Sequence, residues 1–417
     1  MKLADLQREF YFVLGQKSFV SLFAIAFVLS CFAVSTGMAE IEKQNQTIER
    51  LLHHDKLDRQ QAIENHQGFG SIAYYSFHLT YRPPSDLAFA SIGQRDVLSW
   101  KHRIRMLALE GQIHESDTDN PELAFVGRFD FAFLMSVLAP LLVILLLHDL
   151  RATERAAGRY DLLISTAPNK SSLWAARAII SITCLTLALI LPFVTAALIS
   201  GTALNNILLV VLISILFLLF WAGLSYYFSN STNSGPKVAS MLMGVWLVTA
   251  VILPNIAERV IDASIESPSG GDIVLTQREA VNDAWDLPFE TTFDAFIEHY
   301  PEWQDNLEMR SLFEWKWYYA FQQVGDQTAE PLSLAYRQAL VEKGNSAGKV
   351  AWLSPSLLFQ RAISRLAETD LKSTIEYQQQ VRDFHAELRH FYYPYLFGAT
   401  AYEVKLIEQR PEFAPKR

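Results

Sequence analysis

Five strongly apolar runs constrain the fold of this chain more than any other feature of its sequence. Each run has about the 20 residues that an α-helix needs to cross the hydrocarbon core of a bilayer. The predicted spans cover residues 18–38, 130–147, 178–199, 207–228 and 238–256, and their one charged residue is Asp130 at an edge. The fold class predicted is therefore an all-α polytopic membrane protein with about five transmembrane helices.

Charged residues, 19% of the chain, lie in the segments that flank these runs. Residues 1–17 combine apolar positions with Arg8 and Glu9, a pattern typical of a helix on the cytoplasmic membrane surface, and a plain flanking segment is the alternative. Residues 39–129 and 257–417 are polar, and we expect them to pack together as a mostly helical extracytoplasmic domain. Ile41–Glu64 lacks Gly and Pro, so the first transmembrane helix is expected to continue through it.

A cleavable signal peptide is the alternative to the first span, because Gly37-Met38-Ala39 resembles a small-residue cleavage site. The apolar run is longer than the roughly 7–15 residues of a signal-peptide core, which favours an uncleaved anchor. Further along, Tyr74–Tyr81 is rich in aromatic residues, which is typical of a strand or of a membrane-interface segment.

Basic residues are concentrated in the short loops on one side of the predicted spans. They precede the first span, separate the second from the third, and separate the fourth from the fifth: Lys2, Arg8, Lys17, Arg151, Arg155, Arg159, Lys170, Arg177 and Lys237. The turn of residues 200–206, on the other side, has no Lys or Arg. Because cytoplasmic loops carry the excess of Lys and Arg, the amino terminus is predicted to be cytoplasmic and the carboxyl terminus extracytoplasmic.

Composition and motifs exclude several classes of function. A net charge of -9 without a basic arm argues against nucleic acid as a partner. The sequence has no phosphate-binding loop of the G-x-x-x-x-G-K-[ST] type, so ATP hydrolysis is expected in another chain. Both cysteines lie in apolar runs, which argues against a disulfide framework or a zinc site. We predict no catalytic residue, no cofactor and no metal.

Two groups of polar residues could form functional sites, one for a metal ion and one for hydrolysis. Six histidines of the first polar segment could bind copper or zinc, but their spacings fit no ligand motif, which favours solvated or structural histidines: His53, His54, His66, His78, His102 and His114. Paired carboxylates could hydrolyse glycosides. Their spacing of three to four residues is also that of a solvated helix face, which we favour: Asp283, Asp286, Glu290, Asp294 and Glu298.

Residues 148–177 form a charged connection between the second and third spans. Its composition predicts a helix over Asp149–Thr166 that ends before Pro168. Glu154 is three residues from Arg151, close enough to pair. Three arginines are spaced four apart and so share one helix face: Arg151, Arg155 and Arg159. They either hold the loop on the cytoplasmic side or form a docking surface.

This connection resembles the coupling region of ABC-2 type permeases, the membrane subunits of one class of ATP-driven exporters. That region carries a Glu-Arg-x-x-Gly-Thr run, then Leu-Leu, a Ser-x-Pro-like turn, and Gly-Lys at the start of the next span. The matching residues are Glu154, Arg155, Gly158, Leu162, Leu163, Ser165, Pro168, Leu173 and Arg177. Arg159 and Ala176 depart from the usual Thr and Gly.

The resemblance covers residues 1–256, including the Arg8-Glu9 helix and the fifth span that ends in Leu253-Pro254. The polar segments are similar to those of a subgroup with large extracytoplasmic inserts, on the residues of His390–Phe397 and Pro411–Phe413. The family pattern continues into a sixth span, which this sequence does not show after Phe413.

The resemblance implies a permease subunit of the bacterial inner (plasma) membrane that is not itself an enzyme. It would couple ATP hydrolysis by a separate cytoplasmic ABC ATPase to export of a substrate, beside a second permease copy or homologue and within membrane lipid. The residues expected to couple to the ATPase are Arg151, Glu154, Arg155, Gly158, Arg159, Leu162 and Leu163. The alternative function is a membrane-anchored extracytoplasmic binding or scaffold protein without transport.

Overall fold

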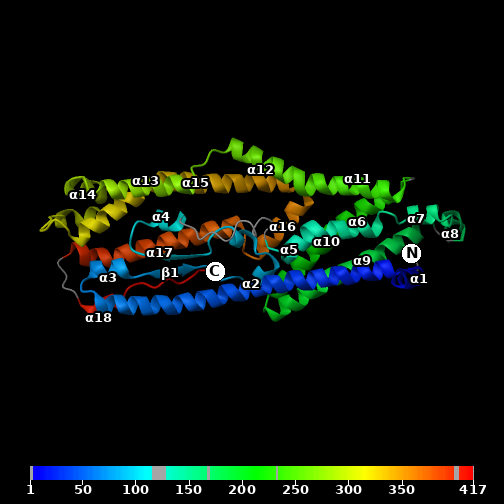
Figure 1. Ribbon diagram of the computed structural model, residues 1–417, viewed down its shortest axis with the longest axis horizontal. Helices are drawn as coiled ribbons and strands as arrows, with labels where there is room; N and C mark the ends of the chain where they lie inside the picture. Colours follow the sequence, from blue (N-terminus) through cyan, green and yellow to red (C-terminus); the bar gives the residue numbers. More distant parts are fainter. Residues whose placement is uncertain (1–2, 115–127, 167–169, 232, 399–402, 417) are drawn as a thin grey trace.

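The structure is a computed structural model that describes residues 3–114, 128–166, 170–231, 233–398 and 403–416. The chain is 77% helical and forms a long, narrow molecule. At one end lies a bundle of apolar helices, which we call the helix bundle (Figure 1). At the other end, the two polar segments lie side by side and form what we call the distal half.

Helix α2 (Lys17–Asn65) runs through both parts as one continuous helix (Figure 1). Its 49 residues make it roughly 73 Å long at about 1.5 Å per residue. The predicted continuation of the first span through Ile41–Glu64 is therefore confirmed. At Gly37 a side chain would collide with the backbone carbonyl of Phe89, so glycine allows the turn η1 (Ala88–Ala90) to pack directly on α2.

Within the described residues, five helices are long and apolar enough to cross a membrane, and each coincides with one predicted span to within one residue at its start or encloses it. A π-helical turn precedes Pro140 and another precedes Pro254, which allows each proline to be accommodated within a continuous span. The elements of the bundle are α1 (Leu3–Gly15), the first half of α2, α5 (Phe131–Phe133), η3 (Leu134–Leu138), α6 (Ala139–Leu147), α9 (Lys170–Ile199), α10 (Leu204–Ser229), α11 (Gly235–Leu247), η4 (Val248–Ile252) and α12 (Leu253–Ser264). These features indicate a multi-pass membrane protein.

The distal half is mostly helical with one small antiparallel sheet, in which His78 of β1 lies opposite Ile104 of β2. The prediction of a strand over Tyr74–Tyr81 is wrong for its first part, because helix α3 continues to Tyr75. Local aromatic content does not distinguish the two structures. The elements are α3 (Phe69–Tyr75), β1 (His78–Tyr81), η1, η2 (Gly93–Asp96), β2 (Lys101–Ile104), α4 (Leu109–His114), α13 (Gly270–Asp283), α14 (Phe289–Ile297), η5 (Pro301–Asn306), α15 (Trp315–Ala351), α16 (Pro355–Leu366), α17 (Leu371–Phe397) and α18 (Val404–Ile407).

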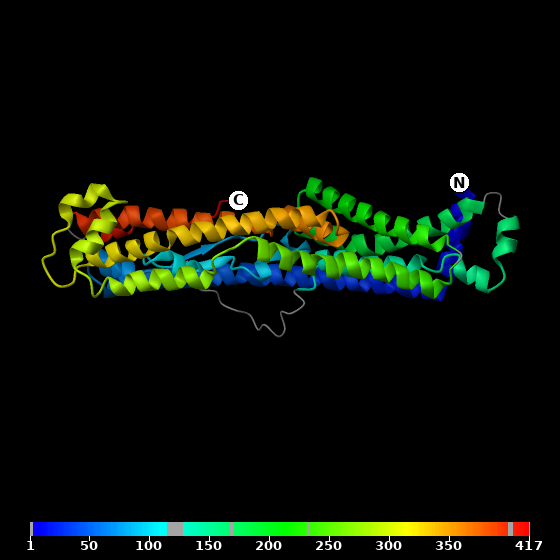
Figure 2. The ribbon, with the colours of Figure 1, turned by 90° about the horizontal axis from the view of Figure 1, so that it is seen from above.

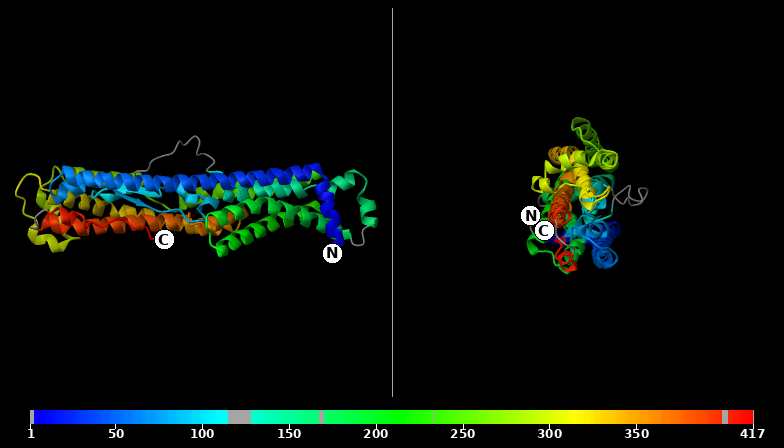
Figure 3. Two further views of the ribbon diagram at one scale, coloured as in Figure 1. Left: turned by 90° about the horizontal axis from the view of Figure 1, so that it is seen from below. Right: turned by 90° about the vertical axis from the view of Figure 1, so that its left-hand side faces the viewer.

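Two hydrophobic cores hold the molecule together. The first lies among the spans, and the second is an aromatic core in the distal half. Both polar segments supply the second core, for example Ile72 and Tyr392, so the expectation that they pack together is confirmed. Trp317 is also buried there. Figure 2 and Figure 3 show that the long helices of both parts run along the same axis.

One helix of the distal sequence belongs to the first core. Phe359 and Ile363 of α16 are buried among the spans, and the ring of Phe359 lies 4.8 Å from that of Phe217 in α10. In contrast, the helix formed by α11, η4 and α12 is largely uncovered. Only 6% of its apolar window is buried, compared with 67% for the second span.

Candidate functional site

The connection between the second and third spans lies at the end of the bundle that also holds the amino terminus (Figure 1). It forms two short helices, α7 (Ala152–Ala156) and α8 (Tyr160–Thr166). The single helix predicted over Asp149–Thr166 is therefore wrong. The chain breaks at Gly158, whose φ of 68° is a conformation that glycine adopts without steric penalty. The expected end before Pro168 lies outside the described residues.

The break separates the three arginines that a single helix would have placed on one face. Arg151 is buried with its guanidinium over the ring of Tyr226. Arg155 donates a hydrogen bond of 2.6 Å to the carbonyl of Ser231, in the loop before the fifth span. Arg159 forms an ion pair with Glu154. Arg151 and Arg155 therefore tie the connection to α10 and to the loop before the fifth span, whereas Arg159 pairs within the connection.

Glu154 is the centre of a buried chain of ion pairs. Its carboxylate accepts hydrogen bonds from Arg159 at 2.8 Å and from Arg177 at 3.2 Å, so the predicted pairing with Arg151 is wrong. Arg177 lies at the start of the third span and also donates to Glu9 of α1 at 2.8 Å. Arg8 pairs with the carboxylate of Glu9 at 3.1 Å. We call Arg8, Glu9, Glu154, Arg159 and Arg177 the charge cluster.

The middle of the charge cluster is shielded from solvent. Glu9 is 2% exposed, and Glu154 and Arg177 are each 5% exposed. The guanidinium of Arg177 lies 4.0 Å from the ring of Phe12 and 5.3 Å from that of Trp174, in good geometry for cation–π contacts. A buried cation with two carboxylate partners and two aromatic neighbours holds α1, α7 and α9 in fixed positions relative to one another.

The turn and the second short helix form the exposed part of the connection. Gly158 is exposed and a side chain added there would meet open space, and Leu162 of α8 is 64% exposed. Leu163, its neighbour, faces inward and packs against the core of the bundle. The arrangement therefore presents an apolar side chain at the end of the molecule, on a helix that is connected to the buried charge cluster.

Sequence reasoning included Glu9 and Arg177 but did not pair them, and it missed Phe12 as a neighbour. Glu9 and Arg177 are 168 positions apart, and nothing local indicates that α1 folds across the third span. The available signal was the position of charges at the edges of apolar segments, since a carboxylate and a guanidinium at such edges are both expected to find partners.

Two histidines of the first polar segment have structural positions, whereas His53 and His54 are exposed on α2. His78 and His102 lie in the paired strands and are buried. Burial lowers the pKa of His78 to about 3 and that of His102 to about 4, so both are neutral near pH 7. Among the described residues, no three His, Cys, Asp or Glu side chains lie in a group that could hold a metal ion.

The acidic residues that repeat along the last polar segment are solvated, as predicted, but they do not share one helix face. Asp283 ends α13, Asp286 lies in the following turn, Glu290 and Asp294 lie on α14, and Glu298 comes directly after it. All five side chains are exposed, while Phe293 and Phe296 on the other face of α14 are buried. This alternation gives these carboxylates a role in solubility and offers no enclosed pair for acid–base chemistry.

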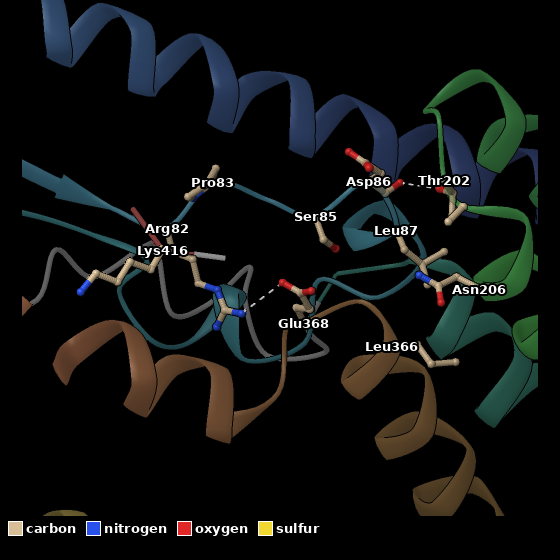
Figure 4. A pocket seen from close by; sticks show the side chains of 11 residues that line it. Arg82, Pro83, Ser85, Asp86, Leu87, Thr202, Asn206, Leu366, Glu368 and Lys416 are labelled. Atoms are coloured by element: carbon tan, nitrogen blue, oxygen red, sulfur yellow. Dashed lines mark hydrogen bonds and ion pairs between the residues drawn. The ribbon is translucent and has the colours of Figure 1, made fainter. Parts of the chain in front are cut away.

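A small cavity of about 130 Å³ lies where the bundle meets the distal half (Figure 4). Arg82 points toward Glu368 across it, at 3.4 Å, and Thr202 donates to the carbonyl of Asp86 at 2.8 Å. Glu368 has a positive φ of 54°, which strains a residue that is not glycine. These contacts fasten the turn between the third and fourth spans to the distal half.

Comparison with known proteins identifies one part of the chain. Residues 273–416, about a third of the sequence, match a family model described as a domain of unknown function (DUF3526). No curated protein matches the chain, and no solved structure matches it. The matched residues lie mainly in the distal half and include α14, α15 and α17. The charge cluster lies outside the match.

Proposed function

We propose that this protein is the permease subunit of an ABC-2 type transporter, coupled to a separate cytoplasmic ATPase. The observation that carries the proposal is the charge cluster, which joins the connection of residues 148–177 to two other helices of the bundle. Glu154, one of the residues that match the coupling motif, is the centre of that cluster. The resemblance in sequence therefore falls on residues with a mechanical connection to the spans.

The geometry supports a direct route for a push from the ATPase. Force on α8 would pass through α7 to Glu154, and from there through the ion pair with Arg177 into the third span. The second ion pair of Arg177, with Glu9, carries the same displacement to α1. Coupling through rigid helices and buried pairs that switch together is an established form of conformational change.

In this proposal the bundle crosses the bacterial plasma membrane with the amino terminus in the cytoplasm. The basic loops and α7–α8 lie at the amino-terminal end of the bundle, which the positive-inside tendency assigns to the cytoplasm. The distal half is then extracytoplasmic. A second copy or a homologous chain completes the transport path, and the ATPase binds around the exposed Leu162.

The test is to purify the tagged full-length chain from native membranes in mild detergent and to identify bound proteins by mass spectrometry. The native chain is expected to retain a protein with a phosphate-binding loop. Leu162→Asp is expected to lose it, because a charge replaces an exposed apolar contact without disturbing a buried one. Leu312→Asp is the matched control, since Leu312 is 88% exposed in the distal half.

Retention of the ATPase by Leu162→Asp to the same degree as by Leu312→Asp would show that α8 is not the docking site. Absence of any ATPase with the native chain would favour the alternative of a membrane-anchored binding or scaffold protein. In that case, a partner that Leu312→Asp loses and Leu162→Asp retains would locate the function in the distal half.

A further inference from the structure

The corner between α15 and α16 exposes several large apolar side chains close together in the sequence. Trp352 is 78% exposed and Leu353 is 66% exposed, and Leu358 on the first turn of α16 is 37% exposed. Large apolar side chains in such a contiguous group mark a surface that another apolar phase covers. We call residues 349–358 the apolar corner.

The position of the apolar corner follows from the register of two helices that run in opposite directions. Lys343 of α15 pairs with Asp262 of α12 at 2.9 Å, which places these two residues at the same level. Trp352 lies nine residues further along α15 toward the bundle, or about 14 Å. Glu258, where the charge-free part of the fifth span ends, is only about 6 Å from Asp262 in that direction.

The apolar corner is therefore level with uncharged residues of the fifth span. Contacts between α16 and the π-helical turn η4 confirm this level, because η4 comes before Glu258 in the span. The exposed side chains Val251 and Ile252 of η4 are at the same depth. The apolar surface of the spans thus continues onto the corner of the distal half.

The chain is basic on both sides of the corner, between Glu342 and Glu368. Residues 343–367 contain no Asp or Glu and four basic residues: Lys343, Lys349, Arg361 and Arg365. Lys349 comes three residues before Trp352, and Arg361 donates to the carbonyl of Gly344, so both lie on the side of the corner away from the bundle centre. Arg365 follows Arg361 by one turn of α16, so it shares the same helix face, and it is exposed. A segment inserted at a membrane surface typically places tryptophan and leucine in the apolar part of the leaflet and basic side chains at the level of the headgroups.

We propose that the apolar corner penetrates the lipid leaflet on the distal side and that Lys349 and Arg365 bind the phosphates of anionic phospholipids there. The long aliphatic stems of these side chains allow the charges to reach the headgroups while the corner lies deeper. The corner then holds the distal half down on the membrane, in addition to the helices and contacts that connect it to the bundle. This inference rests on the spans crossing a membrane and does not depend on an ATPase.

The test uses the full chain in lipid nanodiscs, with both native cysteines replaced and one new cysteine carrying an environment-sensitive fluorophore. The labelled positions are Leu353→Cys, Val248→Cys as the membrane-embedded control, and Leu312→Cys as the water-exposed control. Quenching is measured with lipids that carry a nitroxide near the headgroup end of the acyl chain. We expect strong quenching at 353, close to that at 248, and little at 312.

Quenching at 353 as weak as at 312 would overturn the proposal, whether water or a second protein covers the corner.

The role of Lys349 and Arg365 is tested by comparing phosphatidylcholine discs with discs that also contain phosphatidylglycerol. Quenching at 353 should increase with phosphatidylglycerol and lose that increase in Lys349→Gln/Arg365→Gln. An increase that persists in this variant would refute the role of the two basic residues. Intrinsic fluorescence of the unlabelled chain, compared with Trp352→Phe in brominated lipid, checks the result without cysteine replacement.

Discussion

The charge cluster makes a quantitative prediction about stability. Replacement of Arg177 by Met removes the shared buried cation and leaves the almost fully buried carboxylates of Glu9 and Glu154 with only the solvent-exposed Arg8 and Arg159 as partners. Breaking a buried ion pair by removing one member costs about 3–5 kcal/mol, because the remaining charge is desolvated and uncompensated. We expect Arg177→Met to lower the free energy of unfolding by about that amount.

The other members of the cluster should follow in a fixed order. In Glu154→Gln, Arg177 keeps its ion pair with Glu9, so only a charged hydrogen bond is lost, about 1.5–3 kcal/mol. In Arg159→Gln the lost cation is 58% exposed, and an exposed pair contributes about 0–1 kcal/mol. Denaturant titration of the full chain in detergent, followed by circular dichroism, measures all three midpoints.

A second comparison separates charge from packing. The triple variant Glu9→Gln/Glu154→Gln/Arg177→Met contains no buried charge from the middle of the cluster. It should recover most of the stability lost by Arg177→Met alone, because replacing a whole buried ion network by neutral groups is often nearly neutral. If Arg177→Met were no less stable than Arg159→Gln, or if the triple variant were the weakest of all, the electrostatic account of this site would be refuted.

Two further predictions concern backbone conformation and pH. Gly158→Ala should cost about 1–2 kcal/mol from its positive φ alone, whereas Gly223→Ala, which is equally uncrowded but helical, should be neutral or slightly stabilising; thermal unfolding compares them. Stability should fall as the pH decreases from 6.5 toward 4. The unfolded chain then takes up protons that the buried His78 and His102 do not, and burial also lowers the pKa of His385 in α17, so each of the three contributes about 1.4 kcal/mol per pH unit. His78→Phe should therefore remove about a third of the histidine contribution in urea titrations at several pH values.

The spans and the continuation of the first helix could be predicted because they depend on local composition. A charge-free run of about 20 residues has few alternatives to a transmembrane helix. The absence of Gly and Pro from Ile41–Glu64 likewise left no signal to end α2. Both features are properties of contiguous residues, and the structure differs from these predictions only at helix ends.

The sequence identifies charged residues that belong to the charge cluster, but it does not predict which of them pair. The spacing of Arg151, Arg155 and Arg159 correctly identified a charged connection, but a face shared by all three required an unbroken helix. Gly158 carries the break, and a glycine in a helical pattern is compatible with either outcome. The partners of Glu154 and Arg177 depend on how α1 packs across α9, a contact between segments far apart in the sequence.

Each of the two parts of the molecule contributes a helix to the other, which limits how independently the parts can move. Helix α2 extends from the bundle into the distal half, and α16 returns from the distal half to bury Phe359 and Ile363 among the spans. A displacement of α10 therefore shifts α16 through the contact between Phe217 and Phe359, and α16 is continuous with the apolar corner. Well-packed interiors transmit such shifts because they have low compressibility. Movement of the spans, driven from the end that holds the charge cluster, is thus expected to change how the distal half meets the membrane.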